Sequence, residues 1–210
     1  MILPMGAQQP TAYLVGAGAC ESLDFQPKPG DMVIAVDGGL DYLRQAHIEP
    51  DLALGDFDSL RGEKPDGQVL TYLPEKDESD MLLALRQAIR RNYKRVLMYG
   101  GLGGRLDHTL ANIQTIAWAS RCGVSACLVN GSQTILAVSD GELRLPKTDH
   151  GYLSVFCLGS VAEGVDLIGL KYTLDHAELR DDYPLGLSNE FIGEESIIRV
   201  RSGTLIVVIN

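Results

Sequence analysis

The sequence lacks several features that would each indicate a class of protein. It has no apolar run of the roughly 18 or more residues that a membrane-spanning helix needs, and its first residues, MILPMGAQQP, have no basic flank followed by a sustained apolar stretch. Basic residues are in the minority, because 18 Lys and Arg stand against 28 Asp and Glu, a formal net charge of −10. Affinity for a phosphate backbone depends on a basic surplus, so a nucleic-acid coat protein is disfavoured. These absences predict a soluble, cytoplasmic protein that binds neither membrane nor nucleic acid.

Recognisable metal and hydrolase motifs are also missing. The four cysteines form no CxxC pair, and Cys122 and Cys127 lack a second Cys or His pair at zinc-finger spacing. His47, His150 and His176 show no ligand spacing either, which gives a zinc or iron site little support. Without a Gly-x-Ser-x-Gly elbow, an α/β-hydrolase triad is excluded as well. We therefore expect the cysteines to be free, buried thiols.

What the sequence has is an ordinary globular composition, with 45% hydrophobic and 22% charged residues. Up to about residue 130, short β-type runs alternate with helical patterns, which is typical of a parallel sheet covered on both faces. The β-type runs are Thr11 to Val15, Met32 to Val36, Asp51 to Leu54, Val69 to Leu73, Val96 to Tyr99 and Ala126 to Val129. The helical patterns are Leu40 to Ala46, the face Leu82, Leu85 and Ile89, and the face Leu106, Leu110, Ile113 and Ala117.

After Asn130 the pattern changes to closely spaced β-type runs without a convincing helix. We therefore expect two domains, an α/β domain over residues 1–130 and an antiparallel β-sandwich over residues 131–210. Near the end, the runs Ile197 to Arg201 and Thr204 to Ile209 flank Ser202 and Gly203, which predicts a two-residue hairpin.

Acidic residues cluster where an α/β sheet places its ligand. Asp37 follows one predicted strand, and Asp56 and Asp58 follow another, so these residues belong to the carboxyl ends of strands, where open α/β sheets bind ligands. In an extended chain Asp56 and Asp58 point to one side, and a divalent cation would relieve their repulsion. Mg²⁺ suits such a place, because it takes one or two carboxylates and completes its shell with water and substrate phosphates. The alternative for a single DxD is an ordinary Asp-rich turn in which Asp56 caps the next segment.

A third acidic cluster, EKDESD, opens a helix. Asp77 is predicted as its N-cap with Asp80 at the third helical position, and capping alone could explain the cluster. Lys76 is harder to explain in this way. A lysine ahead of a helix N-terminus is unfavourable for the helix dipole but well placed to meet a phosphate.

The run GGLGGRLDH, from Gly100 to His108, leads from a strand into a helix. Its glycines let the backbone approach an anion, the helix N-terminus supplies unpaired N–H groups, and Arg105 can bind phosphate oxygens at two points. It lacks the spacing of a Walker loop. Gly16-Ala17-Gly18 is not a convincing dinucleotide fingerprint, because Glu21 stands where the third glycine should be. We expect His108 to be structural and Trp118 to lie in the core.

Taken in order, the motifs resemble the thiamine pyrophosphokinase family. The similarity covers about residues 30 to 209 and rests on VDGG, GDFDS, EKDESD, GGLGGRLDH with LANI, GLKY and LSNEF. The resemblance implies an N-terminal α/β domain that binds ATP and Mg²⁺, and a C-terminal β-sandwich that binds thiamine and dimerises. It also implies a homodimer with the active site between subunits. The family transfers a diphosphate from ATP to the hydroxyl of thiamine and releases AMP.

The resemblance also implies roles for single residues. They fall into metal ligands (Asp56, Asp58 and Asp80), the nucleotide site (Asp37, Gly38, Gly39, Lys76, Asp77, Ser79 and Arg105), catalytic groups (Asp58, Arg105 and Asp107) and substrate contacts (Asp107, Tyr172, Ser188 and Asn189). The chain departs from the family at two of these positions. Ser79 stands where Thr is frequent, which keeps the hydroxyl, and Tyr172 replaces the Trp of some members, which alters the strength of stacking.

Two other functions stay open on the residues alone. A phosphatase of the haloacid dehalogenase kind would use Asp56 as its nucleophile, although that class prefers its DxD after the first strand and here it follows a later one. A nucleotide-binding module would have the pocket without turnover. The physics suits the kinase, because phosphoryl-type transfer is mainly positioning and charge stabilisation, for which carboxylates, Mg²⁺, one Arg and one Lys can suffice.

Overall fold

The computed structural model of the protein describes residues 9–55, 69–71 and 78–210. The described chain divides into two compact units, the first made of residues 9–115 and 124–131 and the second of residues 116–123 and 132–210. Within these described ranges, no helix is both long and apolar enough to cross a membrane.

The first unit is built on a parallel sheet. Its strand order is β6-β5-β1-β2-β3-β4, and each neighbouring pair is parallel. The strands are β1 (Thr11–Val15), β2 (Met32–Val36), β3 (Leu52–Gly55), β4 (Val69–Thr71), β5 (Arg95–Tyr99) and β6 (Ser125–Asn130). All residues of β2 and β3 are buried, as expected of apolar strands that are covered on both faces.

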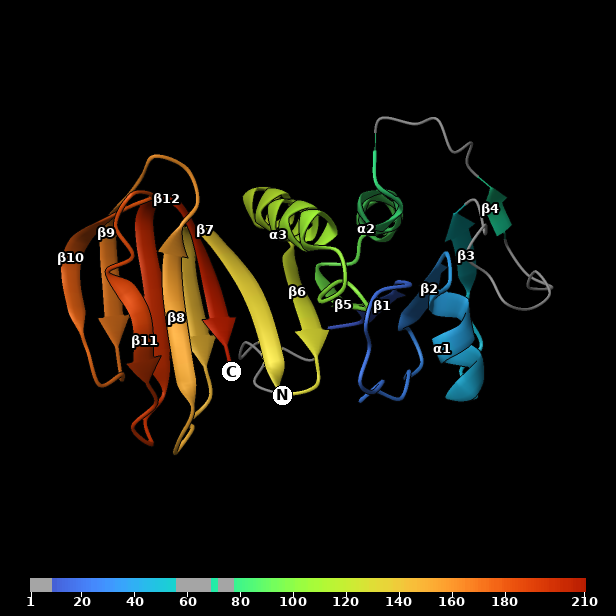
Figure 1. Ribbon diagram of the computed structural model, residues 1–210, viewed down its shortest axis with the longest axis horizontal. Helices are drawn as coiled ribbons and strands as arrows, with labels where there is room; N and C mark the ends of the chain where they lie inside the picture. The colour runs from blue at the N-terminus through green and yellow to red at the C-terminus, as the bar shows by residue number, and fades with distance from the viewer. Residues whose placement is uncertain (1–8, 56–68, 72–77) are drawn as a thin grey trace. The chain divides into compact units, whose positions relative to one another are not determined.

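Helices α1 (Gly39–Gln45) and α2 (Asp80–Arg90) lie on opposite faces of this sheet, and α3 (Leu106–Arg121) follows β5 (Figure 1). The expected cap of α2 is wrong. Its N-cap is Ser79, whose hydroxyl accepts a hydrogen bond from the N–H of Leu82 at 3.3 Å, so Asp80 is the first helical residue rather than the third. The Ser79 hydroxyl accepts from a free N–H group at the start of the helix, as the Asp77 carboxylate was expected to do. Asp77 itself lies outside the described residues.

The buried faces of two helices also differ from the predicted ones. In α2 the buried residues are Met81, Ala84, Leu85 and Ala88. Of the predicted face, Leu85 is fully buried, whereas Leu82 and Ile89 are only half-buried, and the small Ala84 and Ala88 share the buried side with Leu85. In α3, Leu106 and Leu110 are 71% and 55% exposed, because the first turns of the helix follow an exposed loop. Trp118 is half-buried, and core packing on α3 comes from Ile116, Ala117 and Ala119.

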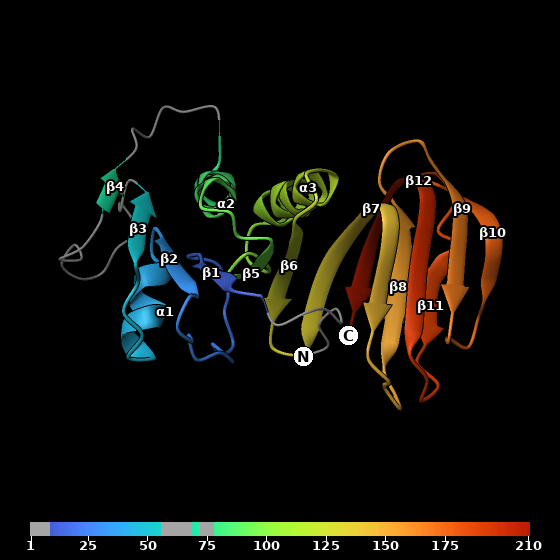
Figure 2. The same ribbon diagram turned by 180° about the vertical axis from the view of Figure 1, so that it is seen from behind.

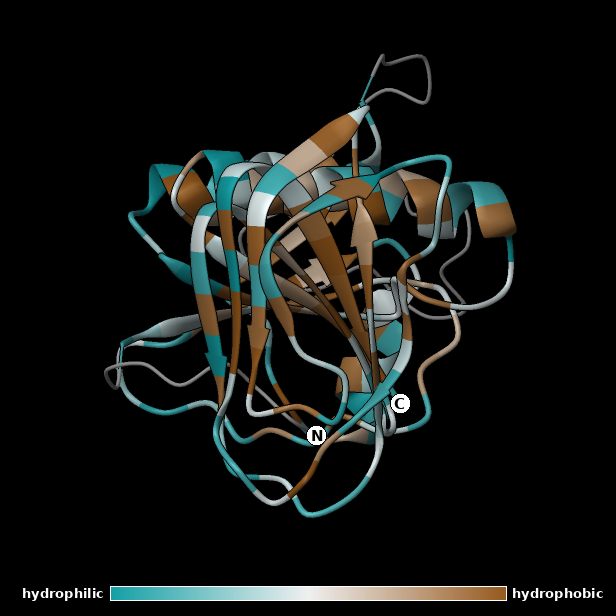
Figure 3. Ribbon diagram, turned by 90° about the vertical axis from the view of Figure 1, so that its left-hand side faces the viewer, coloured by the Kyte–Doolittle hydropathy of each residue, from teal (hydrophilic) through white to brown (hydrophobic). Residues whose placement is uncertain are grey.

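The second unit consists of antiparallel strands. They are β7 (Gln133–Leu145), β8 (Tyr152–Cys157), β9 (Val161–Ile168), β10 (Leu174–Arg180), β11 (Gly186–Glu190) and β12 (Ser196–Ile209). β12 pairs with β7 along nearly all its length, while its first half pairs with β9 and its second half with β8. The strand pairs β10-β9 and β11-β8 are therefore both joined to the long pair β7-β12, through β9 and β8. Figures 1 and 2 show these strands from opposite sides. Hydrophobic residues gather along these strands, and the connecting loops are largely hydrophilic (Figure 3).

The predicted hairpin at Ser202 and Gly203 is wrong, because β12 runs through both residues as one strand. Its register with β7 shifts between Val200 and Thr204, which makes this point a β-bulge. Gly203 has φ of +109°, and its N–H donates to a carboxylate oxygen of Asp140 at 2.8 Å. A glycine between two β-type runs marks a turn or a bulge equally well. The outcome is decided here by β7, which is long enough to pair with both halves of β12.

Candidate functional site

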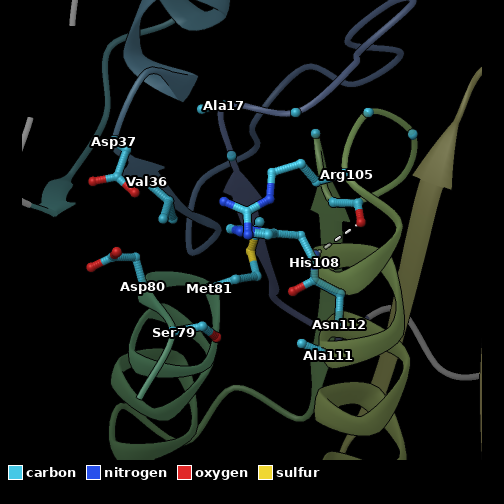
Figure 4. Close-up of a pocket in the computed structure, with 16 residues that line it drawn as sticks. Ala17, Val36, Asp37, Ser79, Asp80, Met81, Arg105, His108, Ala111 and Asn112 are labelled. Atoms are coloured by element: carbon cyan, nitrogen blue, oxygen red, sulfur yellow. Dashed lines mark hydrogen bonds between the residues drawn. The ribbon is translucent and has the colours of Figure 1, made fainter. Parts of the chain in front are cut away.

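A pocket of about 400 Å³ opens at the carboxyl ends of the strands in the first unit. Its walls come from the loops after β1, β2 and β5 and from the first turns of α2 and α3 (Figure 4). In the strand order, β1 is the point at which the chain reverses direction, with β2 to β4 on one side and β5 and β6 on the other. Open parallel sheets bind ligands at such a switch point, because the loops on either side leave a crevice there.

Glycines bring the loops after β1 and β5 together at the pocket. The N–H of Gly16 donates to the carbonyl of Tyr99 at 2.8 Å, and that of Gly18 to the carbonyl of Gly100 at 3.0 Å, so the pairing of the two strands continues into their loops. A Cβ at Gly18 would lie 2.5 Å from the Gly100 carbonyl oxygen, which only glycine avoids. The sequence analysis discounted Gly16-Ala17-Gly18 as a dinucleotide fingerprint, but all three residues line the pocket. Their position directly after an apolar strand was the available signal.

Asp37 lines the pocket at the end of β2. It has φ of +49°, and its N–H donates to the carbonyl of Leu54 at 2.9 Å. Gly55, which ends β3, has φ of +142°, and a Cβ there would overlap the Asp37 carboxylate. Gly55 thus provides the space for this carboxylate, a role that the sequence analysis also missed. Gly38 and Gly39, the other two members of the predicted motif, begin α1 beside Asp37 and do not line the pocket.

Ser79 and Asp80 bring the start of α2 to the pocket. Asp80 lies on the same side as Asp37, and Arg105 lies across the pocket from both (Figure 4). Carboxylate oxygens are the hard donors that Mg²⁺ prefers, so Asp37 and Asp80 are the described pocket residues that could hold such an ion. Four other predicted residues, Asp56, Asp58, Lys76 and Asp77, lie outside the described residues.

Arg105 forms a two-point ion pair with Asp107. Its Nη2 lies 2.5 Å from Oδ2 and its Nε 3.2 Å from Oδ1, and both side chains are well exposed. The hydrogen bond from Arg105 lowers the pKa of Asp107, so this carboxyl is ionised at neutral pH and is a weak base. Water screens an exposed pair, so an anionic ligand can replace Asp107 as the partner of Arg105. His108, which the sequence analysis treated as structural, lines the pocket next to this pair.

Tyr172, Ser188 and Asn189 come together in the second unit. The Asn189 side chain is buried, and its Oδ1 accepts from the N–H of Tyr172 at 2.9 Å while its Nδ2 donates to the Tyr172 carbonyl at 2.6 Å. The Tyr172 side chain is 57% exposed, with the Lys171 ammonium 5.4 Å from the centre of its ring. Ser188 has φ of +57°, and its N–H donates to the Ser154 hydroxyl at 3.0 Å. The arrangement presents an aromatic ring to solvent, where it can stack on a cationic heterocycle.

A three-residue cluster of Asp166, Asp175 and His176 has ligand atoms close enough together to hold a metal, and it is the one such cluster within the described ranges. The buried Asp166 carboxylate is already engaged. It accepts from the N–H of His176 at 2.8 Å and from the Arg199 guanidinium at 3.1 Å. His176 Nδ1 lies 2.8 Å from an oxygen of Asp175 and 3.4 Å from one of Asp166. The two carboxylates therefore form ion pairs with His176 when its imidazole is protonated.

This cluster predicts a pH dependence of stability. The hydrogen bond with Asp175 and the charge of Asp166 raise the pKa of His176, against an opposing charge from Arg201. A histidine whose pKa is higher in the folded than in the unfolded protein stabilises the fold when it is protonated. This stabilisation is complete below the unfolded-state pKa of about 6.5 and is lost as the pH rises through the folded-state pKa. In melting experiments at pH 6 and pH 8, we expect His176→Gln to reduce the advantage of the lower pH. The control is His150→Gln, at an exposed histidine outside the cluster. An unchanged difference in Tm between the two pH values for His176→Gln would contradict the assignment.

Comparisons with known proteins agree with one another. The family model "Thiamin pyrophosphokinase, catalytic domain" matches residues 28–128, and the model "Thiamin pyrophosphokinase, vitamin B1 binding domain" matches residues 142–206. The chain is 31% identical over 182 residues to thiamine pyrophosphokinase of Bacillus subtilis, a match that covers 83% of this chain and 85% of the relative. It is 21% identical to thiamin pyrophosphokinase 1 of Caenorhabditis elegans, with 82% and 76% covered.

Solved structures give the same result. The crystal structure of thiamine pyrophosphokinase from Bacillus subtilis superposes with a TM-score of 0.87 at 28% identity, over 95% of this chain and 98% of that one. The enzyme from Geobacillus thermodenitrificans gives a TM-score of 0.85 at 25% identity, over 95% and 97% of the two chains.

Proposed function

Because the chain belongs to the thiamine pyrophosphokinase family, we propose that it is a thiamine diphosphokinase, which transfers the diphosphate of ATP to the hydroxyl of thiamine and gives thiamine diphosphate and AMP. Beyond the family match, one structural observation carries this proposal. The pocket at the switch point of the parallel sheet brings two glycine loops, two carboxylates and Arg105 around one space. That combination suits a polyphosphate with its counterion.

ATP is the ligand that we assign to this pocket. The N-termini of α2 and α3 and the backbone of the glycine loops offer N–H groups to phosphate oxygens, and Arg105 adds a two-point contact. Asp37 and Asp80, with Asp56 and Asp58 as further expected ligands, would hold Mg²⁺. When bound, the ion would neutralise phosphate charge during the transfer.

The transfer needs little covalent chemistry from the protein. The thiamine hydroxyl oxygen forms a bond to the β-phosphorus, and the bond from that phosphorus to the oxygen shared with the α-phosphate breaks. AMP leaves with that oxygen, and the hydroxyl proton passes to water. Arg105 stabilises the charge of the transferring group. Asp107 is ionised and weakly basic, so its role is to orient the hydroxyl rather than to remove its proton in a separate step.

We assign thiamine to the cluster of Tyr172, Ser188 and Asn189. The exposed Tyr172 ring offers a face to the cationic thiazolium, and the net charge of −10 favours a cationic substrate. We further propose a cytoplasmic homodimer whose active site is shared between subunits, which the resemblance to the family implies. A protein that keeps full activity as a proven monomer would contradict the shared site.

The assignment of Tyr172 predicts a change in one kinetic constant. Removal of the ring in Tyr172→Ala should raise the KM for thiamine about fivefold, since a cation–π contact contributes on the order of 1 kcal/mol. The KM for ATP should stay unchanged, and Tyr172→Phe should stay near wild type because it keeps the ring. Steady-state kinetics with each substrate varied in turn measures both constants. An unchanged thiamine KM would place thiamine elsewhere.

The experiment that tests the function is ³¹P NMR of the purified protein with ATP, Mg²⁺ and thiamine, beside a control without thiamine. Thiamine-dependent appearance of AMP and thiamine diphosphate is the expected result. Release of inorganic phosphate without thiamine would favour the phosphatase, and a phosphorylated Asp56 would identify its nucleophile. Absence of any turnover would favour a nucleotide-binding module.

A further inference from the structure

Asn112 is a buried polar residue in the second turn of α3, with 7% of its surface exposed. Its Nδ2 donates to the carbonyl oxygen of Gly101 at 2.9 Å, so the bond joins the helix to the loop after β5 (Figure 4). An amide that is buried without partners is costly, so this hydrogen bond explains how a polar side chain is accommodated here. Asn112 also lines the pocket, and the sequence analysis assigned it no role.

The start of the loop, at Gly100 and Gly101, is held on several sides. The carbonyl of Gly100 accepts from the N–H of Gly18 at 3.0 Å, which ties the loop to the segment after β1. A Cβ at Gly101 would lie 2.8 Å from the Leu128 side chain and 3.3 Å from the Asn112 amide. The Gly101 peptide is therefore packed between β6 and α3, and the Asn112 amide fixes the direction of its carbonyl.

Beyond the buried Leu102, the end of the same loop has few packing contacts. Gly103 and Gly104 have φ of +76° and +70° and are exposed, and a Cβ at Gly104 would have no neighbour within 4 Å. Arg105 follows immediately, also exposed, and its one described ion pair is with Asp107, two residues further on. The Arg105 carbonyl accepts from the N–H of Thr109 in the first turn of α3 at 3.2 Å, so α3 holds the loop at both ends, here and through Asn112 at Gly101.

We propose that Asn112 is a positioning residue for the transfer reaction: by fixing the Gly101 peptide, it sets the path of the loop that delivers Arg105 to the phosphates of ATP. This inference rests on the proposed function, but it requires no contact between Asn112 and substrate. Loss of the hydrogen bond leaves the Arg105 guanidinium present and places it less often at the phosphates. Nucleotide binding and kcat should therefore suffer, whereas the binding of thiamine should not.

The test compares three variants. Asn112→Ala removes the amide, and Asn112→Asp keeps its shape but replaces the donor with a carboxylate that repels the Gly101 carbonyl. Thr115→Val is the matched control, since Thr115 is equally buried on the same helix and its hydroxyl donates to the Ala111 carbonyl within that helix. If Asn112→Ala fails to fold, Asn112→Asp carries the test.

We expect both Asn112 variants to lower kcat about tenfold and to raise the KM for ATP several-fold, with an unchanged KM for thiamine. Calorimetric titration with α,β-methylene-ATP should show several-fold weaker binding, independent of turnover. Thr115→Val should lower Tm without these kinetic changes. Unchanged kcat and analogue affinity in Asn112→Asp, or equal losses in Thr115→Val, would overturn the inference. A wild-type protein that binds the analogue but never converts thiamine would overturn the proposed function alone.

Discussion

Arg105→Ala is expected to lower kcat/KM for ATP by about 10²- to 10³-fold, the usual effect of removing one preorganised group that stabilises charge in a transition state. Of the described residues that line the pocket, Arg105 is the one that carries a permanent positive charge. The loss should therefore appear mainly in kcat, because the charge on the transferring group is what the guanidinium meets. Steady-state kinetics with ATP varied at saturating thiamine measures both constants.

Two controls make the Arg105 result specific. Arg105→Lys keeps the charge but loses the two-point geometry, so its rate should lie between those of wild type and Arg105→Ala. Arg90→Ala removes an exposed arginine at the end of α2, away from the pocket lining, and should leave the rate unchanged. Because the Arg105 side chain is exposed and paired only with the neighbouring Asp107 among described residues, Arg105→Ala should keep the melting temperature of wild type. A rate within threefold of wild type would remove Arg105 from the reaction.

Strands and their order of succession were the parts of the fold that the sequence predicted best. An apolar run such as MVIAV can be buried on both faces only in a covered sheet, so local composition was enough to define β2. Helix faces were harder, because the buried side of α2 depends on Ala84 and Ala88, whose small size matters only once the sheet is present. The bulge at Gly203 likewise depends on the length of β7, a partner far away in the sequence.

The candidate site divides in the same way. Asp37 and Arg105 were found because each follows a strand, and the carboxyl ends of parallel strands meet at one edge of the sheet. Asn112 belongs to LANI, one of the motifs of the resemblance, but its contact could not be predicted, since its partner Gly101 belongs to another element. Asn189 was predicted as a substrate contact, and the structure adds that its amide is bound to the backbone of Tyr172 on both sides. Such roles arise from tertiary contacts that spacing does not encode.

Gly55→Ala should impair the nucleotide site more than any other small substitution that we consider. Gly55 has φ of +142°, which L-residues rarely adopt, and a Cβ at this position would overlap the carboxylate of Asp37. The Asp37 backbone has little freedom to move away, because it has a positive φ of its own and its N–H is bonded to the Leu54 carbonyl. To relieve the overlap, either the carboxylate must leave the pocket or the end of β3 must shift. Both changes should raise the KM for ATP.

Gly123→Ala is the matched control, because Gly123 has φ of +70° and a Cβ there meets nothing within 4 Å. It should lower the free energy of unfolding by only the conformational cost, about 1–2 kcal/mol. In Gly55→Ala the overlap with the Asp37 carboxylate adds to this conformational cost, so the free energy of unfolding should fall by on the order of 3 kcal/mol or more. Urea unfolding measures it for both variants. The double variant Gly55→Ala with Asp37→Gly removes the clashing carboxylate, so stability should recover in part while turnover stays low. If the double variant is as unstable as Gly55→Ala, the strain lies in the backbone of β3, and Gly55 is needed for its conformation rather than for the space it leaves to Asp37.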